Sequence, residues 1–180
     1  MANPILIPGA ITAKHIDALN KTILAPATLY NGNIVKLSTI STTHQYSQVY
    51  TVGKPATATL ATDVFAIVNE PIRVLTTQGT YSYAGLNDDP RNFQIASGGV
   101  CNAFIPKVGD EFIISVDGTT GSYNATSAPY LVPADSTYTL TFAANTTGVC
   151  TGFLVTNASA FISVGNATRV SAYKVLCVLG

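Results

Sequence analysis

The chain has 180 residues, of which 47% are hydrophobic and only 10% charged, and its formal net charge is zero. Such a composition argues against intrinsic disorder, because disordered chains are rich in charge and poor in apolar residues. No apolar run approaches the roughly 20 residues of a membrane-spanning helix, and the nine Lys and Arg residues are scattered singly, so neither a membrane nor a nucleic acid is expected as a partner.

The first thirty residues differ in pattern from the rest of the chain. A short apolar segment, Ile5, Leu6 and Ile7, lies between two prolines, which exclude it from a helix and from the middle of a sheet. The apolar residues of 12–24 recur at a spacing typical of a short helix. Residues 1–30 are therefore predicted to be either an extended arm that docks on a partner, or a first strand and helix packed on the domain's own core.

From residue 31 onward, short apolar segments alternate with turns rich in Gly, Pro, Asn and Asp, which is the pattern of half-buried strands. Residues 64–68 form an apolar run continuous enough for a strand buried on both faces. Residues 31–180 are thus predicted to form one mainly-β domain, an antiparallel β-sandwich or a barrel. The predicted strands are 34–37, 48–52, 57–60, 64–68, 72–75, 101–105, 111–116, 130–133, 137–142, 152–155, 160–164 and 169–179.

The stretch 76–99 is the least regular part of the predicted domain. Glycines and an Asp-Asp-Pro turn interrupt it, with Tyr81 and Tyr83 between them. Long loops in compact domains commonly carry function, and tyrosines are frequent anchors of protein interfaces. We therefore predict a long irregular loop or loose hairpin whose two tyrosines contact a partner.

Side chains suited to catalysis are scarce. The chain has two histidines, His15 and His44, and neither has a carboxylate nearby at ligand spacing. The pair Asp88 and Asp89 offers too few oxygens for calcium, which binds about six to eight. No phosphate-binding glycine loop or nucleophile elbow occurs in the sequence. The sequence predicts neither an enzyme nor a bound metal or cofactor.

The remaining reactive residue types have structural explanations. Asp110 and Asp117 each lie beside a turn glycine, where aspartate is favoured for backbone reasons. Cys101, Cys150 and Cys177 form an odd set without close spacing. We therefore expect structural, reduced thiols rather than disulfides or metal ligands.

Several segments share features with one group of proteins. They are the proline-bounded segment 3–9, the early strand 31–37, the Val-Gly-Asp entry to a strand at 107–112, the Tyr-Leu-Val-Pro segment 130–134 and the terminal strand 169–179. In these features the chain resembles the small capsid decoration, or cement, proteins of tailed bacteriophages. The resemblance covers most of the chain, and such families have no catalytic residues.

The resemblance implies a protein added to the outer surface of an assembled capsid. It would bind the major capsid protein at junctions between subunits, as a homo-oligomer and most often a trimer, and stabilise the shell. The first ten residues lack the charged and long apolar regions of a signal peptide, so synthesis in the host cytoplasm is expected. Deletion of residues 1–11 is expected to leave a folded domain that no longer binds the shell.

Other roles share this composition. A tail-tube, head-completion or head-fibre protein of a phage is one alternative, and the stretch 76–99 is a candidate for the long hairpin that stacks tube rings. A carbohydrate-binding β-sandwich module that uses Tyr81 and Tyr83 is a less favoured alternative.

Overall fold

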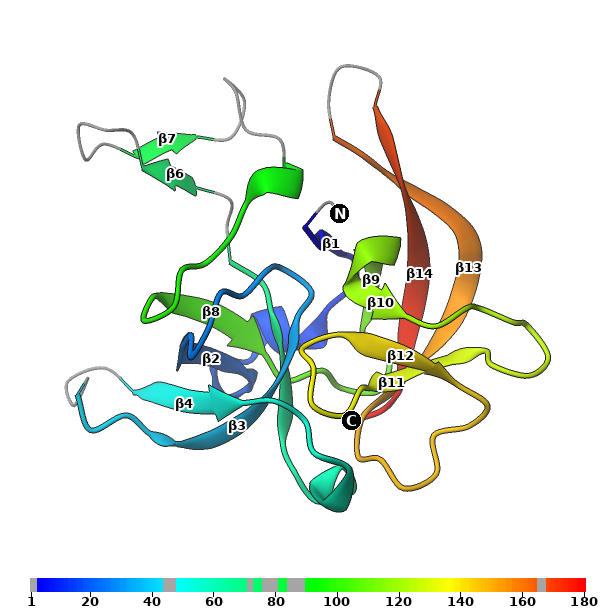
Figure 1. The fold of residues 1–180 in the computed structure, drawn as a ribbon, viewed down its shortest axis with the longest axis horizontal. Coiled ribbons are helices and arrows are strands. Elements are labelled where there is room, and N and C mark those ends of the chain that lie inside the picture. The colour runs from blue at the N-terminus through cyan, green and yellow to red at the C-terminus, as the bar shows by residue number, and fades with distance from the viewer. Residues whose placement is uncertain (1–2, 44–47, 71–72, 76–80, 84–89, 165–167) are drawn as a thin grey trace.

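The computed structural model describes residues 3–43, 48–70, 73–75, 81–83, 90–164 and 168–180. Figure 1 shows a seven-stranded sheet beside a closed five-stranded barrel, with a separate two-stranded hairpin. The described residues form strands and short 3-10 turns but no α-helix. None of these turns is long and apolar enough to cross a membrane. This architecture confirms the predicted mainly-β fold class.

The seven-stranded sheet combines strands from both ends of the chain, in the order β1-β9-β14-β13-β11-β12-β10. Neighbouring strands are antiparallel except for the parallel pair β10 and β12. β13 and β14 form a long hairpin with irregular register. The strands are β1 (Leu6–Pro8), β9 (Glu111–Ser115), β10 (Thr119–Thr120), β11 (Tyr130–Pro133), β12 (Leu140–Ala143), β13 (Gly152–Ser163) and β14 (Arg169–Leu179).

The barrel closes in the order β2-β4-β3-β5-β8. Its neighbours are antiparallel except for the parallel pair β2 and β4. Alternate residues of these strands, among them Ile23, Val35 and Ala66, are buried together inside it. The strands are β2 (Asn20–Leu24), β3 (Ile34–Ile40), β4 (Val49–Gly53), β5 (Phe65–Val68) and β8 (Val100–Phe104).

A second core lies between the barrel wall and the inner face of the sheet. Ile34, Ile67 and Phe104 form one cross-strand row on the barrel and share a buried cluster with Phe112 and Phe153 of the sheet. The ring centroids of Phe104 and Phe112 lie 6.3 Å apart in an edge-to-face arrangement. All four residues of β5 are buried, because the strand lies between the two cores. This confirms the strand predicted to be buried on both faces.

The N-terminal segment is built into both layers. β1 pairs with β9 in the sheet, and β2 pairs with β4 and β8 in the barrel. Of the two alternatives, the structure therefore shows a first strand packed on the domain's own core. The predicted division at residue 30 has no counterpart in the strand pairing.

The helix predicted over residues 12–24 is wrong. Its first half consists of two 3-10 turns, η1 (Thr12–His15) and η2 (Asp17–Leu19), and its second half is β2. Barrel pairing overrides the helix-like spacing because it buries Ile23 completely, and Asn20 and Thr22, which precede Ile23, are weak helix formers.

Other predicted strands also differ from the structure. The segment 57–60 is instead a 3-10 turn, η3 (Thr57–Thr59), whose first amide donates to the carboxylate of Asp135 at 2.7 Å. The segments 152–155 and 160–164 belong to one strand, β13, because the polar residues between them form β-bulges rather than a turn.

The predicted loop 76–99 lies partly outside the described residues. Within it, β7 (Tyr81–Tyr83) pairs with β6 (Arg73–Leu75), and this hairpin lies apart from both sheets in Figure 1. After η4 (Pro90–Asn92), the chain returns to the barrel, where Ile95 forms a bridge with Leu29. The hairpin is thus an insertion between β5 and β8.

Candidate functional site

The structure separates the three apolar residues predicted to dock on a partner. Ile5 and Leu6 are only 4% and 6% exposed, whereas Ile7 is 39% exposed. Leu6 faces the core between the sheet and the barrel, and Ile5 packs in a small cluster with Ile162. Successive residues of a strand point to opposite faces, so Ile7 points away from the core that Leu6 faces, and it is the exposed one of the three.

The tyrosines predicted as interface anchors are only partly described. Tyr81 and Tyr83 lie in β7, opposite Leu75 and Arg73, but their side chains lie outside the described part of the chain. His44 and the pair 88–89 also lie outside it. The predicted contact through the two tyrosines stays a prediction.

The outer face of the seven-stranded sheet carries a band of apolar side chains. Ile7 lies opposite Ile113, and Leu176 lies opposite Leu154, which in turn lies opposite Tyr130. Residues opposite one another in antiparallel strands share a face. Ile7 is exposed and the other four are half-buried. We call these five residues the outer-face band, which crosses β1, β9, β14, β13 and β11.

One ion pair lies within the outer-face band. The ammonium of Lys174 is 2.7 Å from a carboxylate oxygen of Glu111. Lys174 lies opposite Ile113, and Glu111 lies opposite Leu176. Because the two charges neutralise each other, a partner that covers the band would not leave an isolated charge buried.

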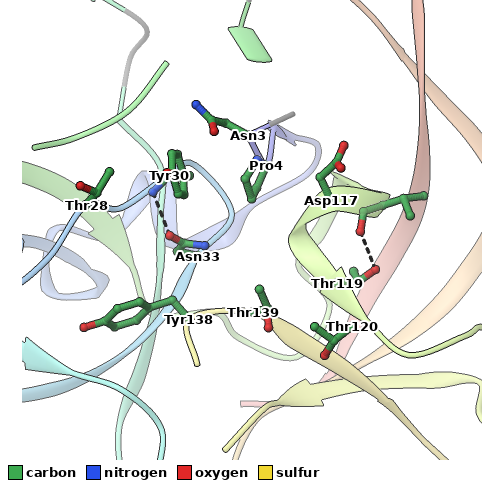
Figure 2. Close-up of a pocket in the computed structure, with 11 residues that line it drawn as sticks. Asn3, Pro4, Thr28, Tyr30, Asn33, Asp117, Thr119, Thr120, Tyr138 and Thr139 are labelled. Carbon is green, nitrogen blue, oxygen red and sulfur yellow. Dashed lines mark hydrogen bonds between the residues drawn. The ribbon is translucent and has the colours of Figure 1, made fainter. Parts of the chain in front are cut away.

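A pocket of about 700 Å³ lies between the barrel and the sheet. The loop between β2 and β3 lines one side, and η5 (Val116–Gly118) and β10 line the other, as Figure 2 shows. The volume falls within the roughly 300–1,000 Å³ of small-molecule sites. The lining residues are Asn3, Pro4, Thr28, Tyr30, Asn33, Val116, Asp117, Thr119, Thr120, Tyr138 and Thr139.

Asn33 is fixed in the barrel side of the pocket. Its side-chain oxygen Oδ1 accepts a hydrogen bond from the backbone amide of Tyr30 at 2.8 Å, and its backbone amide donates to the carbonyl of Tyr30 at 3.0 Å. Gly32 permits this turn with a φ of +89°. The Asn33 side-chain nitrogen points away from Tyr30 into the pocket in Figure 2, and none of the described residues accepts a hydrogen bond from it.

Tyr138 lies beside Asn33 in the pocket wall. Its carbonyl accepts a hydrogen bond from the amide of Ile34 at 2.8 Å, which ties the segment before β12 to the barrel. Its ring packs against the barrel core, and the ammonium of Lys54 lies 5.6 Å from the ring centroid. Burial raises the pKa of Tyr138, so its hydroxyl is uncharged at neutral pH.

The sheet side of the pocket carries one carboxylate. Asp117 is exposed in η5, and no cationic group of the described residues forms an ion pair with it. The hydroxyl of Thr119 donates to the carbonyl of Val116 at 2.9 Å and closes η5. The lining residues include no Lys, Arg or His, so Asp117 is the pocket's one charged side chain.

The pocket was not predicted from the sequence. The turns that contain Asn33 and Asp117 are recognisable from their Asn-Gly and Asp-Gly pairs. Their approach depends on the packing of the barrel against the sheet, which involves residues far apart along the chain.

The described residues offer no metal or thiolate centre. No three of their His, Cys, Asp and Glu side chains gather into a potential metal site. The three cysteines are free thiols. Burial raises the pKa of Cys101 and that of Cys177 to about 12, so neither is a thiolate nucleophile near neutral pH.

Comparisons with protein-family models, with curated proteins and with solved structures found no match to this chain. We therefore argue its function from the geometry described above and from the features of its sequence.

Proposed function

We propose that this chain is a non-enzymatic structural protein of a virus particle, which decorates the outside of a phage capsid. It binds the major capsid protein at junctions between subunits and stabilises the shell there. The resemblance of segments such as 3–9 and 107–112 to decoration proteins supports the viral assignment. The 10% share of charged residues supports extensive protein contact, because the cores of protein interfaces are depleted of charge.

The outer-face band is the observation that carries this proposal. Apolar surface gathered on one face of a soluble protein commonly marks an interaction site, and here a single ion pair, Lys174 with Glu111, interrupts it. Each Å² of apolar surface that a partner covers contributes about 25 cal/mol. The band lies on paired strands, so binding orders few additional groups and loses little conformational entropy.

The same strands favour face packing over strand addition. β1 is an edge strand of three residues, Leu6–Pro8. Pro8 has no amide hydrogen to donate to a strand of another chain, and short edges that contain proline resist pairing. We therefore assign the capsid contact to side chains of the outer-face band, with Ile7 at its margin.

The proposal includes self-association. The resemblance favours a trimer, and sedimentation velocity of the purified chain measures it directly. A single species of trimer mass supports this part of the proposal, whereas a monomer at all concentrations contradicts it.

Binding to capsids that lack the chain tests the capsid contact. Purified protein is mixed with such capsids and sedimented, and the bound fraction is measured against concentration. We expect Ile7→Asp to weaken binding at least about tenfold, because a partner would have to bury the new carboxylate. Ile40→Asp is the matched control, since Ile40 is 48% exposed on the barrel strand β3.

Two results would contradict the proposal. Failure of the wild-type chain to bind any capsid would remove the decorating role. Equal binding by wild type and Ile7→Asp would exclude the outer-face band as the contact.

A tail-tube protein is the second candidate function. The observation in its favour is the β6–β7 hairpin, which forms a two-stranded sheet of its own. In that case the chain would be recovered with purified tails and would be absent from purified heads.

A further inference from the structure

The pocket between the barrel and the sheet shares no residue with the outer-face band. Capsid docking through the band therefore leaves the pocket without a role. Backbone bonding fixes both of its walls: on the barrel the carbonyl of Asn33 accepts a hydrogen bond from the amide of Val68 at 2.9 Å, and on the sheet Thr119 pairs with Leu140. A pocket held in this way is formed before any ligand arrives.

Asn33 presents a hydrogen-bond donor to this pocket. The side chain is only 3% exposed, and the bond from Tyr30 to its Oδ1 fixes the orientation of the amide group. The nitrogen Nδ2 then faces the pocket (Figure 2) with no acceptor among the described residues. A donor that a ligand covers without bonding it costs free energy, so a suitable ligand carries an acceptor at this point.

The charges of the lining exclude several classes of ligand. Phosphates and other anions are disfavoured, because the lining offers Asp117 and no cationic side chain. A purely apolar ligand would leave the Asn33 nitrogen and the Asp117 carboxylate without partners. The lining therefore suits a ligand that carries no negative charge and has both hydrogen-bond donors and acceptors.

The apolar part of the lining narrows the class further. The rings of Tyr30 and Tyr138 flank Asn33 in Figure 2, and Pro4 lies close to Tyr30. A sugar ring combines apolar C–H faces, which pack on such surfaces, with hydroxyls that donate and accept at its rim. One hydroxyl can accept from Asn33 while another donates to Asp117.

We propose that this pocket binds a neutral saccharide. The bound sugar packs against the tyrosine side of the pocket and exchanges hydrogen bonds with Asn33 and Asp117. This differs from the carbohydrate module suggested by the sequence, which relied on Tyr81 and Tyr83. It does not rest on the capsid assignment, because capsid binding and sugar binding are measured separately.

Saturation-transfer NMR on the full chain tests this proposal. The NMR probes are the free sugars glucose, galactose, mannose and N-acetylglucosamine. A separate binding assay uses immobilised oligosaccharides built from the same four sugars. Transfer to a free sugar assigns a site for a single residue, whereas binding of the oligosaccharides alone assigns a glycan chain as the source. Either result supports the proposal, and the absence of both overturns it.

Variants locate the binding. Asn33→Asp keeps an oxygen for the amide of Tyr30 but removes the donor, and Asp117→Ala removes the acceptor. We expect each to weaken binding at least about tenfold, with Asp17→Ala, an exposed aspartate outside the pocket, within about twofold of wild type. If Asn33→Asp does not fold, the sugar affinity of Asp117→Ala alone tests the proposal, because Asp117 is exposed and its replacement leaves the core intact. Wild-type affinity in the folded variants would overturn the proposal.

Discussion

Asp110 joins the N-terminal segment to the turn before β9. Its carboxylate is fully buried, and it accepts hydrogen bonds from the amides of Thr12 at 2.7 Å and Lys107 at 2.8 Å. The sequence predicts only the local part of this role, a turn-forming aspartate beside Gly109. The bond to Thr12 spans almost a hundred residues, and no pattern in the sequence indicates it.

Replacement of Asp110 tests this connection. We expect Asp110→Ala to lower the free energy of unfolding by about 2–4 kcal/mol, because two amides lose a charged acceptor. Urea denaturation measures the change. The control is Asp17→Ala, an exposed residue whose loss is expected to change stability by less than about 0.5 kcal/mol. Equal stability of the two variants would show that the carboxylate is not a structural link.

Thiol reactivity tests the burial of the cores. With a pKa of about 12 for Cys101 and Cys177, only about one thiol in 10⁴ is ionised near pH 8. Burial also raises the pKa of Cys150, which is only half-buried. In the folded chain we expect a thiol reagent to modify no cysteine rapidly other than Cys150. After unfolding we expect it to modify all three cysteines. Rapid modification of all three without unfolding would contradict closed cores.

At the scale of elements, the alternation of apolar and polar residues predicts where strands lie better than it predicts which strands pair with each other. The terminal strand 169–179 was predicted with its observed bounds, and 111–116 within one residue, because both alternate between a core and an outer face. The division into a barrel and a sheet was not predicted. It depends on pairings such as β2 with β4 and β1 with β9, whose partners are set by tertiary packing.

The structure changes the expectation for deletion of residues 1–11. The deletion removes β1 and the buried side chains of Ile5, Leu6 and Ile11. Each buried side chain of this size contributes about 1.5–3 kcal/mol, so the loss approaches the whole stability of a typical domain. We now expect a largely unfolded chain.

Circular dichroism and thermal unfolding of the truncated chain measure this loss. A cooperative transition close to that of the full chain would show instead that the segment is a dispensable arm, as the rejected alternative supposed. Ile7→Asp in the full chain serves as the control, because Ile7 faces solvent and its replacement leaves the core intact.

The whole molecule couples two layers through one shared core. The chain begins in the sheet, forms the barrel, and returns to the sheet, so that β1 and β14 both flank β9. This arrangement leaves one broad sheet face with an outer-face band and one pocket at the junction of the layers. A chain of this kind, with zero net charge and only 10% charged residues, suits a role in which other proteins cover much of its surface.

Electron microscopy of native particles with and without this chain tests the capsid proposal most directly. We predict density on the outer shell at junctions between major capsid protein subunits, with the seven-stranded sheet turned toward the shell. The density should disappear from particles that lack the chain. Density in the tail, or identical particles with and without the chain, would contradict a capsid-decorating function.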